Sequence, residues 1–141
     1  HSLLELGLVD PVAARVRREL AAHVAGIWEQ LARQSAPFLR IGGAEWGAAS
    51  RWWGSGASGK PLEIDVVAES LDRKAVLIGE TKWSASAVHA EALVESLRAR
   101  AAEAPFVKGR KVVYALWLKQ AVKADRGVAV VLPDDVLGAL R

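Results

Sequence analysis

The 141-residue sequence contains no cysteine and no methionine. Without cysteine, the chain forms no disulfide, no thiolate zinc site and no cysteine nucleophile. A bound metal would therefore be held by oxygen atoms or by the three histidines, His1, His23 and His89. The wide separation of these histidines in the sequence argues against a site built from histidine alone. Oxygen ligands are the expected ones.

Long apolar runs are also missing. The longest aliphatic stretch is Val128–Leu132, whereas a membrane-spanning helix needs about 20 apolar residues. The N-terminus lacks the basic and then apolar pattern of a signal peptide. We therefore expect a cytoplasmic protein with no membrane partner. Because the chain begins with His1 and contains no methionine, we also expect a fragment of a longer or processed protein.

The composition is that of a globular protein, with 52% apolar and 25% charged residues. The length is sufficient for one domain over residues 1–141, with a core at about 11–132. The net charge is +3. No acidic residue lies between Glu103 and Asp125, a segment with five cationic residues, which are Lys108, Arg110, Lys111, Lys119 and Lys123. Such a segment favours a polyanion such as DNA; an ordinary solvated surface explains it equally well.

The spacing of apolar residues predicts a mixed α/β fold. A helix is expected at about 11–34, with an apolar stripe formed by Val16, Leu20, Val24, Ile27 and Leu31. The remaining predicted elements are strands at 48–54, 62–69 and 75–83, a helix at 85–104, strands at 111–118 and 127–132, and a helix at 133–140. This order predicts a central mixed sheet flanked by helices.

Charged residues interrupt the strand patterns. In the strand at 75–83, the face of Val76 and Ile78 continues into Glu80 and Lys82. A hairpin turn at 71–74 would bring Asp65 of the preceding strand close to Glu80, because the turn lies midway between them. Two close carboxylates repel each other unless a cation lies between them, and oxygen ligands suit Mg²⁺ or Mn²⁺. A metal site and a structural salt-bridge cluster are equally supported by this pattern.

Glu29 is a third acidic residue that could belong to the same site, because it lies on a helix face of small residues. Four small residues flank it at helical spacing, Ala22, Ala25, Gly26 and Ala32. Small residues let a helix approach a sheet closely, so that the Glu29 carboxylate would reach past the sheet edge. The alternative is a pair with Arg33 four residues later, worth about 0.3–0.5 kcal/mol. The helix alone does not decide between these interpretations.

Four segments, taken in order, resemble the PD-(D/E)XK nuclease superfamily, which has a restriction-endonuclease-like α-β-β-β-α-β core. The segments are Gly26–Glu29, Arg51–Gly54, Glu63–Ala68 and Gly79–Trp83. They are most similar to the uncharacterised nuclease-like domain at the C-terminal end of archaeal and bacterial AAA-type ATPases. The similarity covers about residues 20–85. The proline that gives the motif its name is replaced by Ile64, at a position that varies widely in the superfamily.

The resemblance implies a function and a set of site residues. Asp65 and Glu80 would be ligands of Mg or Mn, with the Thr81 backbone carbonyl as a further ligand. Lys82 would orient or activate the attacking water, and Glu29 would assist through a second metal or a bound water. The implied function is a metal-dependent DNA endonuclease acting as the effector module of an ATPase. The alternatives are an inactive nuclease-fold module, which binds DNA or regulates the ATPase, and a plain scaffold.

Five residues are predicted to contact nucleic acid: Arg51, Trp52, Lys108, Arg110 and Lys111. Trp52 and Trp53 are adjacent, so in a strand one ring points away from the core and can stack on a base. Packing beneath a helix explains these rings as well. A homodimer is a further expectation, because cutting two strands requires two sites. The segment Gly54–Lys60 matches the beginning of a phosphate-binding loop motif. Pro61 stands where this motif requires Ser or Thr, which favours a hairpin loop instead.

Overall fold

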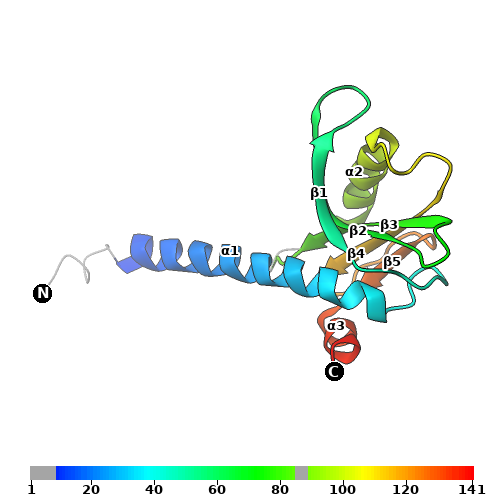
Figure 1. The fold of residues 1–141 in the computed structure, drawn as a ribbon. Coiled ribbons are helices and arrows are strands. Elements are labelled where there is room, and N and C mark those ends of the chain that lie inside the picture. Colours follow the sequence, from blue (N-terminus) through cyan, green and yellow to red (C-terminus); the bar gives the residue numbers. More distant parts are fainter. Residues whose placement is uncertain (1–8, 85–88) are drawn as a thin grey trace, which may run out of the picture.

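A computed structural model describes residues 9–84 and 89–141, and it contains a five-stranded sheet with helices on both faces (Figure 1). The elements, in chain order, are α1 Val9–Ser35, the 3₁₀ turn η2 Ala36–Phe38, β1 Ser50–Ser55, β2 Pro61–Glu69, β3 Ala75–Lys82, α2 Ala90–Glu103, β4 Lys111–Leu118, β5 Val128–Val131 and α3 Pro133–Ala139. The predicted α/β class is confirmed. The first part of the predicted second helix, residues 85–88, lies outside the described residues.

The sheet is mixed, and its strands follow the order β1-β2-β3-β4-β5. β1, β2 and β3 form an antiparallel meander, whereas β3, β4 and β5 run parallel. A parallel neighbour requires a crossover connection, and α2 is the crossover between β3 and β4. Burial on both faces explains why β3 and β4 are nearly continuous apolar runs, in contrast to the alternating pattern of β2.

Two apolar clusters fill the space between the sheet and the helices. On the face that we name the α1 side, Trp28 and Ala32 of α1 pack with Val66, Leu77 and Trp117 of the sheet. On the opposite face, the α2 side, Val94 and Leu97 of α2 pack with strand residues that include Ile64, Val76, Ile78 and Leu116. These clusters assign each strand residue to one side of the sheet.

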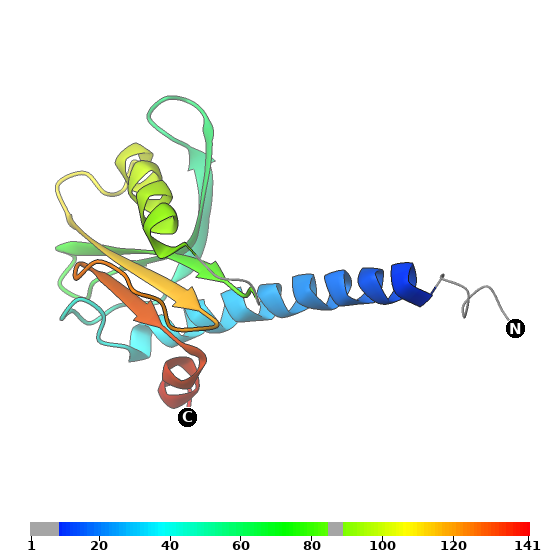
Figure 2. The same ribbon diagram turned by 180° about the vertical axis from the view of Figure 1, so that it is seen from behind.

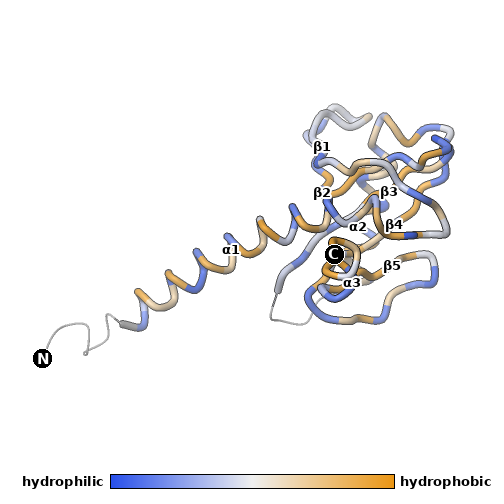
Figure 3. Tube along the Cα trace, turned by 60° about the horizontal axis from the view of Figure 1, so that its bottom comes forward, coloured by the Kyte–Doolittle hydropathy of each residue, from blue (hydrophilic) through white to orange (hydrophobic). Residues whose placement is uncertain are grey.

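Only the C-terminal part of α1 packs against the sheet. Figures 1 and 2 show that the rest of this helix projects away from the body of the protein. On the projecting part, apolar residues recur along the helix (Figure 3), and Val12, Val16 and Leu20 are 53%, 49% and 57% exposed. Of the predicted apolar stripe, Leu31 packs against the core, whereas Val16, Leu20 and Ile27 are exposed. Trp28 and Ala32 are buried instead.

The packing of α1 is fixed by a tryptophan pair in the core. The indole N–H of Trp28 donates to the backbone oxygen of Trp117 at 3.0 Å, and the indole N–H of Trp117 donates to Ser35 Oγ at 3.2 Å. Since a free indole N–H would be costly to bury, these two bonds select the angle at which α1 lies on the sheet. Among the described residues, no helix has both the length and the apolar character needed to cross a membrane.

Candidate active site

A β-bulge at Asp65–Val66 shapes the candidate site. Ser50 of β1 pairs with Val67, and Trp52 pairs with Ile64, so β2 carries one residue more than β1 between these pairs. As a result Ile64 packs on the α2 side, whereas Val66 packs on the α1 side. Regular alternation along residues 62–69 predicts that Ile64 and Val66 share one face of the sheet, and this prediction is wrong because of the bulge. A bulge re-aims the side chain that it carries.

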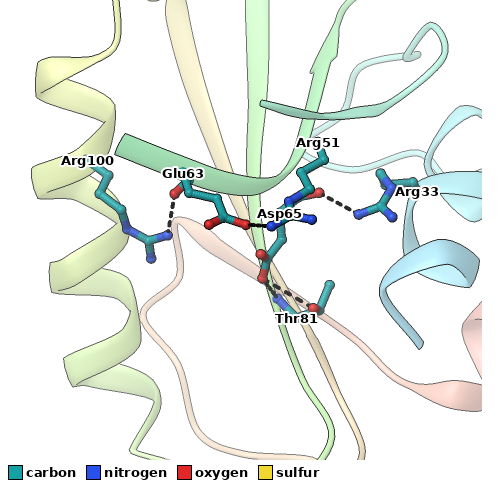
Figure 4. A network of polar contacts seen from close by, with 6 residues as sticks. All are labelled: Arg33, Arg51, Glu63, Asp65, Thr81 and Arg100. Atoms are coloured by element: carbon teal, nitrogen blue, oxygen red, sulfur yellow. Dashed lines mark hydrogen bonds and ion pairs between the residues drawn. The ribbon is translucent and has the colours of Figure 1, made fainter. Parts of the chain in front are cut away.

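The bulge turns the Asp65 side chain toward β3, where it accepts hydrogen bonds from the end of the strand. The β2–β3 pairing runs from Glu69–Val76 to Val66–Gly79 and does not continue to Asp65. There the carboxylate oxygen Oδ2 accepts hydrogen bonds from the Thr81 backbone N–H at 3.0 Å and from the Thr81 hydroxyl at 3.2 Å (Figure 4). The carboxylate thus replaces a strand backbone as the acceptor for β3. The sequence predicts that Asp65 lies close to Glu80; in the structure it contacts the next residue, Thr81, whereas the Glu80 carboxylate pairs with Arg100.

Two residues of α1 accompany Asp65. The Arg33 guanidinium donates from Nη1 to the Asp65 backbone oxygen at 3.1 Å (Figure 4). Burial raises the pKa of the half-buried Glu29 carboxyl, and the negative charge of Asp65 raises this pKa further, whereas Arg33 and Arg51 lower it. Glu29 and Asp65 are therefore close enough for their charges to interact. Arg33 binds the Asp65 backbone in addition to its electrostatic effect on Glu29.

The raised pKa of Glu29 gives a testable dependence of stability on pH. The Glu29 carboxyl binds a proton more tightly in the folded state than in the unfolded state. Its contribution to the free energy of unfolding is therefore complete below the ordinary pKa of 4.5 and is lost as the pH rises through the raised pKa. Replacing Glu29 with Gln should therefore stabilise the protein relative to the wild type as the pH increases. We expect a difference below about 1 kcal/mol, since solvent screens a half-exposed group. Urea unfolding at several pH values measures it.

The exposed residue Glu91 provides the control for this measurement, as Glu91→Gln. Parallel pH profiles for Glu29→Gln and the wild type would show that the environment of Glu29 does not favour its protonated form.

Glu80 lies on the other side of β3 from the Thr81 side chain. Its carboxylate is 12% exposed and forms an ion pair through Oε2 with Nη2 of Arg100, from α2. The same guanidinium donates from Nη1 to the Glu63 backbone oxygen at 3.0 Å (Figure 4). Arg100 therefore joins α2, β2 and β3 where the strands separate. Lys82, the last residue of β3, is exposed.

The donors at this site are of the type that Mg²⁺ and Mn²⁺ prefer, since Asp65, Glu80 and the Thr81 carbonyl supply oxygen only. In the arrangement observed, Asp65 is bonded to Thr81 and Glu80 to Arg100. Within residues 9–84 and 89–141, no group of three or more His, Cys, Asp or Glu residues is gathered so that it could hold a metal ion. Sharing one ion would therefore require Glu80 to leave Arg100.

The adjacent tryptophans divide between the two sides of β1. Trp52 packs edge-on against Phe106, with ring centroids 5.1 Å apart, on the α2 side. Trp53 is 70% exposed. The exposed ring is thus Trp53 rather than Trp52, because the residue paired with Ile64 faces the α2 core. Arg51 lies near the site and forms an ion pair with Glu63 (Figure 4).

The other basic residues predicted to bind nucleic acid lie elsewhere. Lys111 pairs with Ala75 at the beginning of β3, whereas Lys82 pairs with Leu118 at its end. These positions are about 23 Å apart along the strand. Lys108 and Arg110 immediately precede Lys111 in the chain. These three basic residues therefore lie near the opposite end of the central strands from the candidate site.

Arg100 and Arg33 were not predicted as site residues from the sequence. Arg100 follows the buried Leu97 by three positions, which places it at the border of the packed face of α2. An arginine at such a border signals a partner on the neighbouring sheet. The sequence does not identify that partner, because it depends on how α2 crosses the strands.

Comparison with known proteins identifies a family. The sequence model of DUF234, described as archaeal and bacterial proteins of unknown function, matches residues 1–94 of the 141. The matched segment includes Glu29, Asp65, Glu80, Thr81 and Lys82. No curated protein and no solved structure matches the chain significantly.

Proposed function

The chain belongs to the DUF234 family, and we propose that it is a nuclease-like domain of the PD-(D/E)XK type that hydrolyses phosphodiester bonds in DNA with Mg²⁺ or Mn²⁺. The observation that carries the proposal is the bond from the Asp65 carboxylate to Thr81, between Glu80 and Lys82. It places the acid of one strand beside the residue that separates the acid and the lysine of the next. The proposal includes attachment to an ATPase in the cytoplasm.

The residues of the site have separate tasks in this proposal. Asp65, Glu80 and the Thr81 carbonyl would hold the ion, which supplies a nucleophile at neutral pH and polarises a phosphoryl oxygen. The exposed ammonium of Lys82 offsets the negative charge that develops on the phosphate. Glu29 would exchange a proton close to Asp65, a role that suits a carboxyl whose pKa is raised by burial and by the charge of Asp65. Arg33 holds the Asp65 backbone in position.

A second candidate function is favoured by the pair of Arg100 and Glu80. Arg100 already supplies positive charge to the Glu80 carboxylate. A domain that keeps this pair would bind DNA or regulate an attached ATPase without hydrolysis, because a fold does not guarantee its chemistry. The two candidates differ in whether a divalent ion replaces the guanidinium.

Cleavage of supercoiled plasmid DNA in Mn²⁺ tests the proposal. We expect cleavage by the wild type and a loss of at least about a hundredfold in Glu80→Gln and in Lys82→Ala. The matched controls are Glu91→Gln and Lys74→Ala, two exposed residues that have no part in the proposed site; both should cleave normally. Equal cleavage by all variants would contradict the proposal. Salt-sensitive DNA binding without cleavage in any divalent ion would favour the second candidate.

A further inference from the structure

The hairpin of β1 and β2 carries a large aromatic ring in solvent. Trp53 is 70% exposed, although burying an aromatic ring is strongly favourable. The Arg51 guanidinium lies 5.6 Å from the centroid of this ring. Glu63, which is opposite Trp53 in the strand pairing, holds Arg51 by an ion pair. The ring and its cation are thus fixed relative to each other on one face of the hairpin.

This face leads directly to the candidate active site. Trp52 packs on the α2 side, so Trp53 and its neighbour Glu63 face the α1 side, like Asp65. Asp65 follows Glu63 by two residues, or about 7 Å along the strand. Successive nucleotides of one DNA strand rise by about 3.4 Å. The ring therefore lies on the same face as the Asp65 carboxylate, at a distance that one or two nucleotides of a bound strand can span.

The surface beside the ring is hollowed. A depression of about 470 Å³ is lined by Trp53, Gly54, Ser55, Pro61, Leu62 and Glu63. This volume is in the range of sites that bind small molecules. An open depression with an aromatic wall suits a flat π-system. The Arg51 cation beside that ring favours a π-system attached to an anion, which is the chemistry of a nucleotide.

We propose that Trp53, with Arg51, stacks on an unpaired nucleobase next to the phosphate that Asp65 and Glu80 act on. The inference rests on the proposed function and adds a substrate class, which is DNA with a single-stranded segment at the site. Stacking requires that the base be exposed, so a continuous duplex does not satisfy it. Arg51 faces the phosphate of the stacked nucleotide, and Glu63 keeps its guanidinium over the ring.

Fluorescence anisotropy with labelled (dT)₁₂ and a twelve-base-pair duplex, both in EDTA, tests the inference without cleavage. Trp53→Ala should bind (dT)₁₂ about five- to a hundredfold more weakly than the wild type, and Trp53→Phe should keep most of the affinity. Duplex affinity should change by less than about twofold, since a paired base offers no free face. Phe38→Ala is the matched control, because Phe38 is 69% exposed on the η2 turn.

The inference is overturned if the wild type does not bind (dT)₁₂, if Trp53→Ala binds it like the wild type, or if ring removal weakens duplex binding equally. The absence of metal separates this result from the proposed function. If binding depends on Trp53 but no variant cleaves DNA in Mn²⁺, the stacking site stands and the hydrolytic function fails. If Glu80-dependent cleavage occurs but binding is independent of Trp53, the hydrolytic function stands and the stacking site fails.

Discussion

Replacement of Arg100 with Gln is expected to lower the free energy of unfolding of the metal-free protein by about 1–3 kcal/mol and to strengthen Mn²⁺ binding about tenfold or more. The Glu80 side chain is only 12% exposed and loses its ion-pair partner in this variant. A carboxylate left unpaired in such surroundings is costly. The same carboxylate becomes available to a divalent ion, which restores the missing positive charge.

The two effects have a joint signature in thermal unfolding. Without metal, Arg100→Gln should melt below the wild type, and saturating Mn²⁺ should raise its Tm more than that of the wild type, because an ion that binds the folded state stabilises it. Calorimetric titration with Mn²⁺ measures the affinity directly. Arg98→Gln on the same helix is the control: its pair with Asp125 is at 3.8 Å and well exposed, so little change is expected.

Unchanged Mn²⁺ affinity in Arg100→Gln would show that the guanidinium and the ion do not compete for Glu80. If neither protein binds Mn²⁺, the second candidate function is favoured, since Arg100 would then be a permanent part of the site. Arg100 acts through Glu80 and is thus a positioning residue, whose effect is visible in stability and metal affinity without measuring catalysis.

Replacement of Gly79 with Ala is expected to destabilise the protein by about 3 kcal/mol, a fall in Tm on the order of 10 °C. A Cβ atom at Gly79 would lie 2.4 Å from Cζ3 of the buried Trp117 ring and 3.1 Å from Cβ of Val66. The Trp117 ring cannot move away freely, because its indole N–H is bonded to Ser35. Thermal unfolding or urea titration measures the loss.

Gly26→Ala is the matched control for this substitution. Gly26 lies inside α1, and a Cβ added there meets no atom within 4 Å. Alanine is a better helix former than glycine, so this variant should be more stable by up to about 1 kcal/mol. The two glycine substitutions are thus expected to have opposite signs. Equal stability of Gly79→Ala and the wild type would show that Trp117 does not press against β3.

The sequence predicted the elements of the fold well because their signals are local. β4 was expected at residues 111–118 and lies at Lys111–Leu118. The hairpin turn at 71–74 is present, and it places Asp65 beside Thr81, one residue from the expected neighbour Glu80. Strand periodicity and turn composition depend on neighbouring residues only, which is why one sequence is sufficient to recognise them.

The details of the site depend on contacts between distant residues and were not predictable in the same way. The bulge at Asp65–Val66 reverses the sides of the residues that follow, and an analysis of alternation assumes that no bulge occurs. The partner of Glu80 comes from position 100, on an element whose crossing angle the sequence does not specify. The apolar stripe of α1 has the periodicity of a packed helix, but the sheet ends before most of the stripe.

The projecting part of α1 has a mechanical consequence. An α-helix advances about 1.5 Å per residue, so Val12 lies about 25 Å along the rod from Glu29. The distal turns and the turn that bears Glu29 and Arg33 belong to one continuous helix. A movement of the helix at Val12 is therefore transmitted along α1 to Arg33, which is hydrogen-bonded to the Asp65 backbone. A partner that tilted the projecting end would therefore displace Arg33 and Glu29 relative to Asp65.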